Sequence, residues 1–210
     1  MTAWVRVDCH VHTVASGDSV LRPEELVDRA RSEGIDVVFV TDHHEVAAAQ
    51  RLASSNGIRV VVGEEIRTPA GELLGLFLTE RIPYVLPVDE VIDRIHAQGG
   101  LVCLPHPYDE VRASVGAIAD RLCASGRVDA VEVFNAKAGT AQVNERAAEL
   151  ARRHGLPGTA GSDAHDPDGI GAAYLEMPDF ATPREFLAGL RQARVVGSLR
   201  PHARRFLPRG

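Results

Sequence analysis

Short runs of β-branched apolar residues alternate along the chain with longer segments of helical periodicity. This alternation is typical of βα units. Polar residues, mostly acids and histidines, end six of the apolar runs, which span residues 5–12, 38–44, 60–65, 101–106, 131–135 and 158–165. Because strand interiors supply packing, polar groups placed repeatedly at strand ends predict one shared mouth lined with candidate metal ligands.

Local signals predict where the helices begin and end. Pro23 suits the first position of a helix that Gly34 stops, and Thr182 opens a capping box with proline in its first turn. The remaining helices are expected over about 45–55, 88–98, 115–124 and 141–154, and the last runs to about residue 193. The alternation breaks once, because 58–66 and 73–78 are both strand-like and predict a hairpin. We therefore expect an α/β barrel of parallel strands with one irregularity and helices outside.

Length and composition are those of one soluble globular domain. The chain has 210 residues, of which 45% are hydrophobic and 25% charged, and its net charge is −6. This charge argues against a general nucleic-acid binder, and we expect a single domain over residues 1–199 followed by a basic tail, 200–210. No apolar stretch approaches the roughly 18 residues that span a bilayer, and no signal-peptide pattern is present. The three cysteines, Cys9, Cys103 and Cys123, predict reduced, buried thiols of a cytoplasmic protein.

His10 and His12 are the first candidate ligands. Two residues apart on an extended strand, they point to the same face at about 7 Å, close enough to bind one metal ion. Asp8 shares that face by the same alternation, whereas Cys9 points away. Taken alone, such a pair more often consists of exposed or hydrogen-bonded histidines than of metal ligands.

Three further strand ends carry similar residues. Asp163 and His165 repeat the two-residue spacing, His43 follows Asp42 at another strand end, and His106 ends a fourth strand. Each alone is consistent with an ordinary turn or surface residue. Their joint placement at one end of a barrel predicts a metal centre.

Together these residues resemble the motifs of the PHP (polymerase and histidinol phosphatase) superfamily over about residues 5–176. The resemblance implies a distorted (β/α)7 TIM-like barrel that holds two or three divalent ions, typically zinc, manganese or iron. It assigns the first ion to His10, His12, Glu65 and Asp163. Glu65 would bridge to a second ion that also takes His106. The third would be held by His43, His165 and an acid from the loop after the first strand.

Two positions in this ligand set are open. Asp18 is our candidate for the loop acid, although a Gly-Ser loop also uses aspartate simply to form a turn. Glu72 stands where the family more often has a histidine for the second ion. A carboxylate is a competent ligand, but a solvent-facing Glu72 would leave that site incomplete. Glu64 and Glu65 point to opposite faces, so only one of them enters the mouth.

The expected activity is metal-dependent hydrolysis of a phosphate ester of a small metabolite or nucleotide. Clustered divalent ions lower the pKa of bound water and neutralise charge on phosphoryl oxygens. Asp8 and Asp42 are the catalytic candidates, placed behind the ligands to orient their imidazoles. We expect the substrate anion to be bound at the rim by Lys137, Asn135 and Arg67.

Two other functions remain open. The same chemistry hydrolyses carbon–nitrogen or carboxyl ester bonds, and degenerate PHP domains attached to polymerases act as metal-binding accessory domains. A small phosphorylated substrate is the expected partner, the end of a nucleic-acid strand is less favoured, and no membrane is involved. The oligomeric state is left open.

Overall fold

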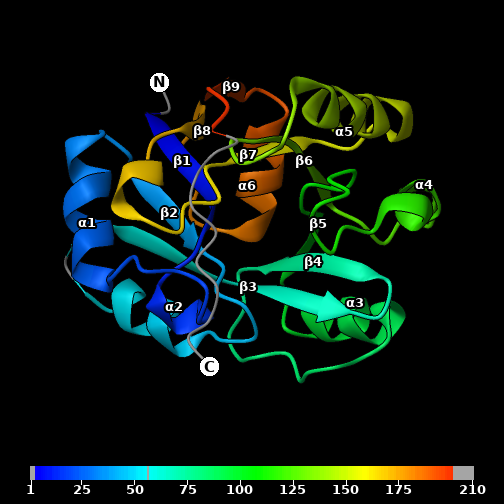
Figure 1. Ribbon diagram of the computed structural model, residues 1–210, viewed down its shortest axis with the longest axis horizontal. Helices are drawn as coiled ribbons and strands as arrows, with labels where there is room; N and C mark the ends of the chain where they lie inside the picture. Colours follow the sequence, from blue (N-terminus) through cyan, green and yellow to red (C-terminus); the bar gives the residue numbers. More distant parts are fainter. Residues whose placement is uncertain (1–2, 56, 201–210) are drawn as a thin grey trace.

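The computed structural model describes residues 3–55 and 57–200, and within them nine strands form one sheet (Figure 1). Their order across the sheet is β7-β6-β5-β4-β3-β2-β1-β8-β9. The strands are β1 (Trp4–Val11), β2 (Val37–Val40), β3 (Arg59–Thr68), β4 (Gly71–Leu76), β5 (Leu101–Leu104), β6 (Ala130–Asn135), β7 (Gly158–Gly161), β8 (Ala173–Pro178) and β9 (Arg194–Gly197).

The first seven strands form the nearly closed, distorted barrel that the sequence predicts. Six neighbouring pairings follow the expected pattern, in which β4 alone runs antiparallel to both neighbours and forms the predicted hairpin with β3. The segment after β7 then meets the end of β1: Asp163 N–H donates to the carbonyl of His10 (2.8 Å) and His12 N–H to that of Ala164 (3.0 Å). These two bonds close the barrel at its mouth.

The last two strands were not among the expected elements. β8 pairs antiparallel with Trp4–Val7, at the opposite end of β1 from the closure with β7, and β9 pairs antiparallel with β8. The edge of β1 is therefore shared between two partners along its length. Residues of β8 alternate strictly between buried and part-buried. Over only six residues, such a period of two is too short to predict a strand from the sequence.

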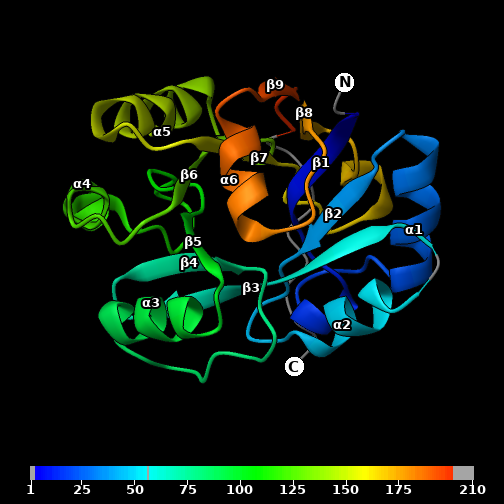
Figure 2. The same ribbon diagram turned by 180° about the vertical axis from the view of Figure 1, so that it is seen from behind.

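All six expected helices are present, most of them slightly shorter. Helices α1 (Pro23–Ser32) and α2 (Ala47–Ala53) cover one side of the barrel, and α3 (Val88–Ala97), α4 (Ala119–Ala124) and α5 (Ala141–His154) cover the other (Figure 2). None of the helices in the described part of the chain is long and apolar enough to cross a membrane. The predicted basic tail lies, apart from Arg200, outside the described residues.

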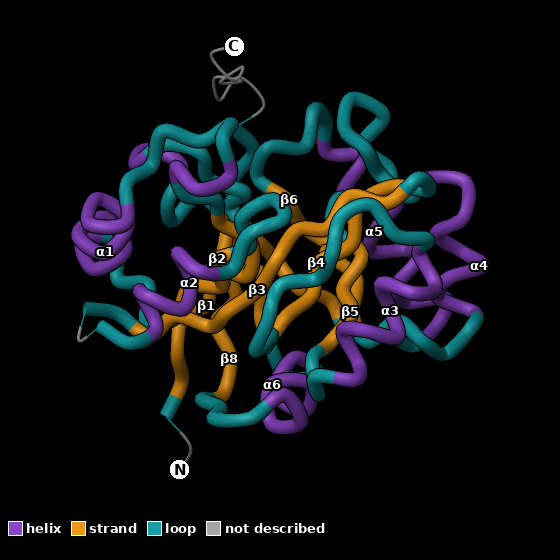
Figure 3. Tube along the Cα trace, turned by 90° about the horizontal axis from the view of Figure 1, so that it is seen from below, coloured by secondary structure: helices purple, strands orange, loops and turns teal. Residues whose placement is uncertain are grey.

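Helix α6 (Pro183–Leu190) closes the barrel at the end where the strands begin (Figure 3). Its Phe186 is fully buried and contacts Phe39, Phe77 and Phe180, with ring centroids 5.0, 5.6 and 4.9 Å away. Such tilted and edge-to-face pairs add to the free energy gained by burying the rings. The aromatic cluster therefore fills one end of the barrel and leaves the other end for polar groups.

A bulge in β1 sets how its polar residues point. Asp8 pairs with Val38 but Val11 with Val40, so β1 has one extra residue between them. As a result Cys9 packs with Val7 inside the barrel, while Val11 packs outside against α1 and α2. The regular alternation expected for this strand therefore breaks between Cys9 and Val11. The three cysteines are free and buried, as predicted.

Candidate metal centre

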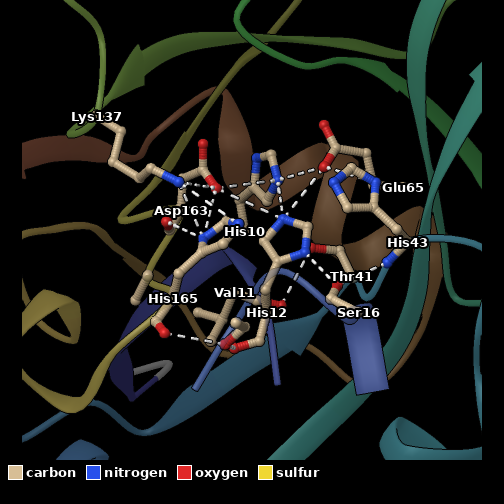
Figure 4. A network of polar contacts seen from close by, with 12 residues as sticks. His10, Val11, His12, Ser16, Thr41, His43, Glu65, Lys137, Asp163 and His165 are labelled. Carbon is tan, nitrogen blue, oxygen red and sulfur yellow. Dashed lines mark hydrogen bonds and ion pairs between the residues drawn. The ribbon is translucent and has the colours of Figure 1, made fainter. Parts of the chain in front are cut away.

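His10 and His12 lie at the mouth of the barrel with both side chains fully buried (Figure 4). Their Nε2 atoms are 3.0 Å apart and face the same small space. The bulge in β1 brings this about, because it turns both residues toward the mouth after the strand leaves the apolar interior. Two imidazole nitrogens at this separation are suited to share a cation.

Glu65 supplies a carboxylate that contacts four of the histidines, among them His10, whose Nε2 lies 3.4 Å from Glu65 Oε2. Its Oε2 lies 3.1 Å from His12 Nε2, and its Oε1 lies 3.0 Å from His106 Nε2. His43 Nδ1 is 3.5 Å from Oε2. Glu64 turns the other way, where its Oε2 accepts the backbone N–H of Ile82. Glu65 thus lies in the mouth and has two oxygens for two different ions.

Asp163 and His165 enter the site from the segment after β7. Asp163 Oδ1 is 3.5 Å from His12 Nε2 and 3.8 Å from His10 Nε2. His165 Nε2 lies 3.3 Å from Asp18 Oδ2, which is also 3.5 Å from His43 Nε2. Asp18 therefore bridges the two histidines that the family resemblance assigns to a third ion.

The donor set fits divalent metal ions. Within the described residues, three overlapping groups place their ligand atoms within 4.8 Å of one another: His10, His12 and Asp163; His10, Glu65 and His106; His12, Asp18 and His43. Three atoms of this set are buried without a hydrogen-bond partner, namely Asp18 Oδ1, His43 Nδ1 and His106 Nδ1. Buried polar atoms left without a hydrogen-bond partner in such a set are consistent with a bound cation.

Further polar groups orient the imidazoles from behind. The Oε1 atom of Glu132 lies 3.0 Å from His10 Nδ1, and Ser16 Oγ lies 2.7 Å from His12 Nδ1. Ser16 also accepts the backbone N–H of His43 (2.8 Å). A carboxylate can only accept, so His10 donates from Nδ1, and Nε2 is the nitrogen that a metal would take.

Burial and neighbouring charges shift the pKa values of the candidate ligands, in several cases in opposite directions. Burial favours neutral His10, yet the Asp163 and Glu132 carboxylates hold the pKa of this imidazole well above its usual range. Burial would also raise the pKa of Asp163, but Lys137 and Arg112 hold it well below the usual value. Burial and the nearby His165 lower the pKa of His12 to about 3. The centre thus combines charged carboxylates with at least one neutral imidazole ligand.

Asp8 and Asp42, the two catalytic candidates, contact backbone and hydroxyl groups. Asp8 Oδ1 accepts the backbone N–H groups of Ser162 (2.9 Å) and His10 (3.2 Å). Burial raises the pKa of Asp8 to about 7. Asp42 accepts from the backbone and the hydroxyl of Thr13, at 2.5 and 2.8 Å. Contrary to expectation, neither carboxylate hydrogen-bonds an imidazole.

The three expected substrate residues differ in how accessible they are. Lys137 is part-buried beside the ligands, with Nζ 3.0 Å from His165 Nδ1 and 3.6 Å from Asp163 Oδ1. Asn135 is fully buried, and its side chain is bonded to Glu132, Asp163 and the Lys137 backbone. Its polar atoms are therefore used within the protein, which does not match the substrate contact predicted for it.

Arg67 and Glu72 form an ion pair at the edge of the centre. Arg67 Nη2 donates to Glu72 Oε1 at 2.8 Å. Glu72 is 3% exposed, and its other oxygen, Oε2, lies 4.0 Å from His106 Nε2. Glu72 therefore points inward, not to solvent, with one oxygen directed at the second group of ligands.

Sequence reasoning missed two residues of this network. Glu132 could have been found, because an acid in the middle of the apolar run 130–134 needs a buried partner. Arg112 lies in the loop after β5 and gave no such signal. Its guanidinium bonds Asp109, Asn135 and Asp163 and is only 15% exposed. It places a fixed positive charge beside Lys137, on the same side of the mouth.

Two family models match the chain. One, described as the PHP domain, matches residues 8–155, more than half of the sequence. The other, described as PHP-associated, matches residues 141–195. The first match includes seven of the nine candidate ligands, all except Asp163 and His165, which lie within the second.

Three curated proteins illustrate the sequence similarity. Two are uncharacterized proteins of Methanocaldococcus jannaschii. The first is 39% identical over 145 residues, which cover 63% of this chain and 82% of that protein. The second is 35% identical over 194 residues, which cover 87% of this chain and 78% of that protein. A 5'-3' exoribonuclease of Haemophilus influenzae is 41% identical over 66 residues, which cover 30% of this chain and 24% of the enzyme.

Solved structures share the fold. A two-domain protein of Bacteroides vulgatus ATCC 8482, which contains a predicted PHP-like metal-dependent phosphoesterase, matches with a TM-score of 0.74 at 18% identity. That match covers 94% of this chain and 66% of the other. PsfC from Pseudomonas syringae PB-5123 matches with a TM-score of 0.72 at 20% identity, over 97% and 95% of the two chains. At these identities the likeness establishes the architecture.

Proposed function

Since the chain belongs to the PHP domain family, we propose that it is a metal-dependent phosphoesterase acting on a small phosphorylated metabolite or a nucleotide. The observation that carries this proposal is the convergence at the barrel mouth of three overlapping groups of candidate ligands, two fully buried and the third part-buried. Nine side chains from separate strand ends and loops meet there, at a cost in buried charge that bound cations would offset.

The proposed ligand sets follow from which atoms face one another. His10, His12, Glu65 and Asp163 would hold the first ion, and Glu65, His106 and Glu72 the second. The third would take Asp18, His43 and His165. When bound, two or three divalent ions supply positive charge for phosphoryl oxygens and lower the pKa of coordinated water.

The chain's own cations support an anionic substrate. Lys137 and Arg112 both lie beside Asp163, so one side of the mouth carries two positive side chains. Arg112 is held in place by Asp109 and Asn135, and its planar guanidinium suits paired oxygens of a phosphate. Lys137 places its ammonium group 3.0 Å from His165 Nδ1, on the same side of the mouth. A neutral amide or ester brings no charge of its own to this pair in the ground state, so the pair favours a phosphate ester.

Turnover on a substrate panel tests the proposal. The panel holds phosphomonoesters, nucleotides and short oligonucleotides, together with an amide and a carboxyl ester, all with added Mn²⁺. The oligonucleotides are included because one relative is a 5'-3' exoribonuclease. We expect release of inorganic phosphate or of nucleotides, and no cleavage of the amide or the carboxyl ester.

Variants connect the activity to the site. His10→Ala and Asp163→Ala should abolish turnover while circular dichroism shows an intact fold. His96→Ala is the matched control, because His96 is exposed in α3 and hydrogen-bonds only Asp129. Silence across all phosphate esters with metal bound at full occupancy would overturn the proposal. Cleavage of the amide or the carboxyl ester alone would replace it with the corresponding hydrolase.

A further inference from the structure

Glu132 is a buried carboxylate in the middle of β6, 1% exposed, behind the candidate ligands. Its two oxygens contact three separate parts of the barrel mouth. Oε1 lies 3.0 Å from His10 Nδ1, at the end of β1. Oε2 accepts the backbone N–H of His106 (2.7 Å) and the side-chain amide of Asn135 (3.0 Å).

The contact with His10 fixes which ring nitrogen is available. Because a carboxylate offers only acceptor lone pairs, the shared proton must lie on His10 Nδ1. The Nε2 atom then keeps its lone pair, and this is the atom that faces His12 and Glu65. A hydrogen bond from a carboxylate behind the ring also raises the basicity of the ligand nitrogen.

The contact with His106 acts on its backbone. His106 has a φ of 27°, in the left-handed region that residues with a side chain rarely adopt. The N–H of this strained residue donates to Glu132, so the carboxylate helps to hold the turn that directs the ring toward Glu65. The same oxygen binds Asn135, whose amide also donates to Asp163 Oδ2 at 3.2 Å.

The surrounding strands leave room for this arrangement. A Cβ at Gly161 of β7 would lie 2.9 Å from Glu132 Oε1 and 2.4 Å from His10 Cβ. Strands β1, β6 and β7 therefore approach at a point where any other residue would displace the Glu132–His10 contact. Glycine at position 161 is thus compatible with the observed positions of Glu132 and His10, and a side chain there is not.

We propose that Glu132 is a positioning residue that sets the His10 tautomer and the His106 turn, and thereby organises the first two metal sites. The proposal rests on the metal chemistry proposed above. It goes further by assigning to one side chain outside the ligand sets a specific effect on metal binding.

Glu132→Gln is the sharpest test, because it keeps the shape and removes one acceptor. Its single carbonyl oxygen can still accept from His106 and Asn135, which places the NH₂ group against His10 Nδ1. That arrangement demands an acceptor at Nδ1, so the His10 proton moves to Nε2 and blocks the ligand atom. We expect Zn²⁺ affinity, measured by chelator competition at pH 7.5, to fall about 10- to 100-fold.

Glu64→Gln is the matched control. Glu64 is also a fully buried strand glutamate that accepts a backbone N–H, but it points away from the ligands. Its substitution should leave Zn²⁺ affinity unchanged. Equal affinities for Glu132→Gln and the unsubstituted protein would overturn the inference about Glu132 alone. Absence of Zn²⁺ binding by the unsubstituted protein would overturn both this inference and the proposed function.

A measurement on the unsubstituted protein does not depend on how the variant folds. Correlation of ¹H and ¹⁵N through the histidine rings of the zinc-loaded protein shows which nitrogen carries the proton. We expect His10 to have the proton on Nδ1 and the metal on Nε2. Metal on Nδ1, or a proton on Nε2, would overturn the proposal even if Glu132→Gln failed to fold.

Discussion

The Nε2 atoms of His10 and His12 face each other at 3.0 Å, both within the fully buried part of the barrel mouth. Each ring has its other nitrogen in contact with a second group, Glu132 for His10 and Ser16 for His12. With both protons on Nδ1, two lone pairs would point at one another. A positive charge must lie between them, and a proton on His10 or a metal ion can provide it.

Metal binding should therefore stabilise the fold. At a free concentration of 100 times the dissociation constant, one ion adds about 2.7 kcal/mol to the free energy of unfolding. For a chain of this size that corresponds to a rise in Tm of roughly 5–10 °C. Differential scanning calorimetry with and without Mn²⁺ or Zn²⁺ measures it, and His10→Ala should lose most of the shift. An unchanged Tm with the ion bound would contradict this prediction.

Metal affinity should increase with pH. Burial alone would lower the pKa of His43, but Glu65 and Asp18 raise it to about 9. At pH 7 this imidazole is protonated without metal, and an ion must displace the proton to bind. Affinity should therefore rise from pH 6 until pH passes about 9.

Proton release provides the direct measurement. Isothermal titration with Mn²⁺ at pH 7 in two buffers of different ionisation enthalpy should show release of at least one proton. The number should fall in His43→Ala, which removes the group that titrates. Metal binding without proton release at pH 7 would contradict the assignment of His43 as a ligand.

Much of the barrel could be predicted from sequence because local signals agreed with the fold. Helix α1 begins at Pro23, and α6 begins directly after its N-cap Thr182, as expected. The hairpin of β3 and β4 is where two strand-like runs adjoin in the sequence. The bulge in β1 could not be predicted, because it depends on how β1 pairs with β2. Its effect is that Val11 packs on the other side of the sheet from Val7 and Cys9, which the expected alternation placed on one face with it.

Some residues of the candidate metal centre could likewise be predicted from the sequence, and others could not. Candidate ligands at strand ends follow from motif and spacing, and the structure brings all nine together at one mouth. Arg112 could not be found, because it reaches Asp163 from a loop whose path no local pattern sets. The contacts of Asp8 and Asn135 likewise depend on which strand end lies opposite, a long-range property of the closed barrel.

Lys137 should act mainly in substrate binding. Its ammonium group lies 3.6 Å from Asp163 and is part-buried at the rim, where it can reach a phosphate oxygen. For a phosphate ester that the protein hydrolyses, Lys137→Met should raise KM about tenfold or more and change kcat less, because the chemistry depends on the metal ligands. Steady-state kinetics measures both. An unchanged KM would show that the anion binds elsewhere, with Arg112 as the first alternative.

Glu64 should make the folded state less stable as pH rises. Burial raises the pKa of this carboxyl to about 7, although Ile82 and Arg81 oppose the shift. The folded protein therefore holds a proton that the unfolded chain loses above about pH 4.5, and the free energy of unfolding falls between pH 4.5 and 7. Glu64→Gln should remove this decline, which amounts to about 3 kcal/mol at most. Urea unfolding at pH 4.5 and 8 compares the two, and a parallel pH dependence would contradict the prediction.

Phe186 should contribute to stability without affecting the metal centre. It is fully buried in the aromatic cluster that closes the other end of the barrel, where it contacts Phe39, Phe77 and Phe180. Phe186→Ala should lower the free energy of unfolding by about 3–5 kcal/mol, because it leaves a cavity among packed rings. Urea denaturation measures this cost, with the exposed Val195→Ala as control. Zn²⁺ affinity of the folded variant should stay within twofold of the unsubstituted protein, and a larger loss would show that the two ends of the barrel are coupled.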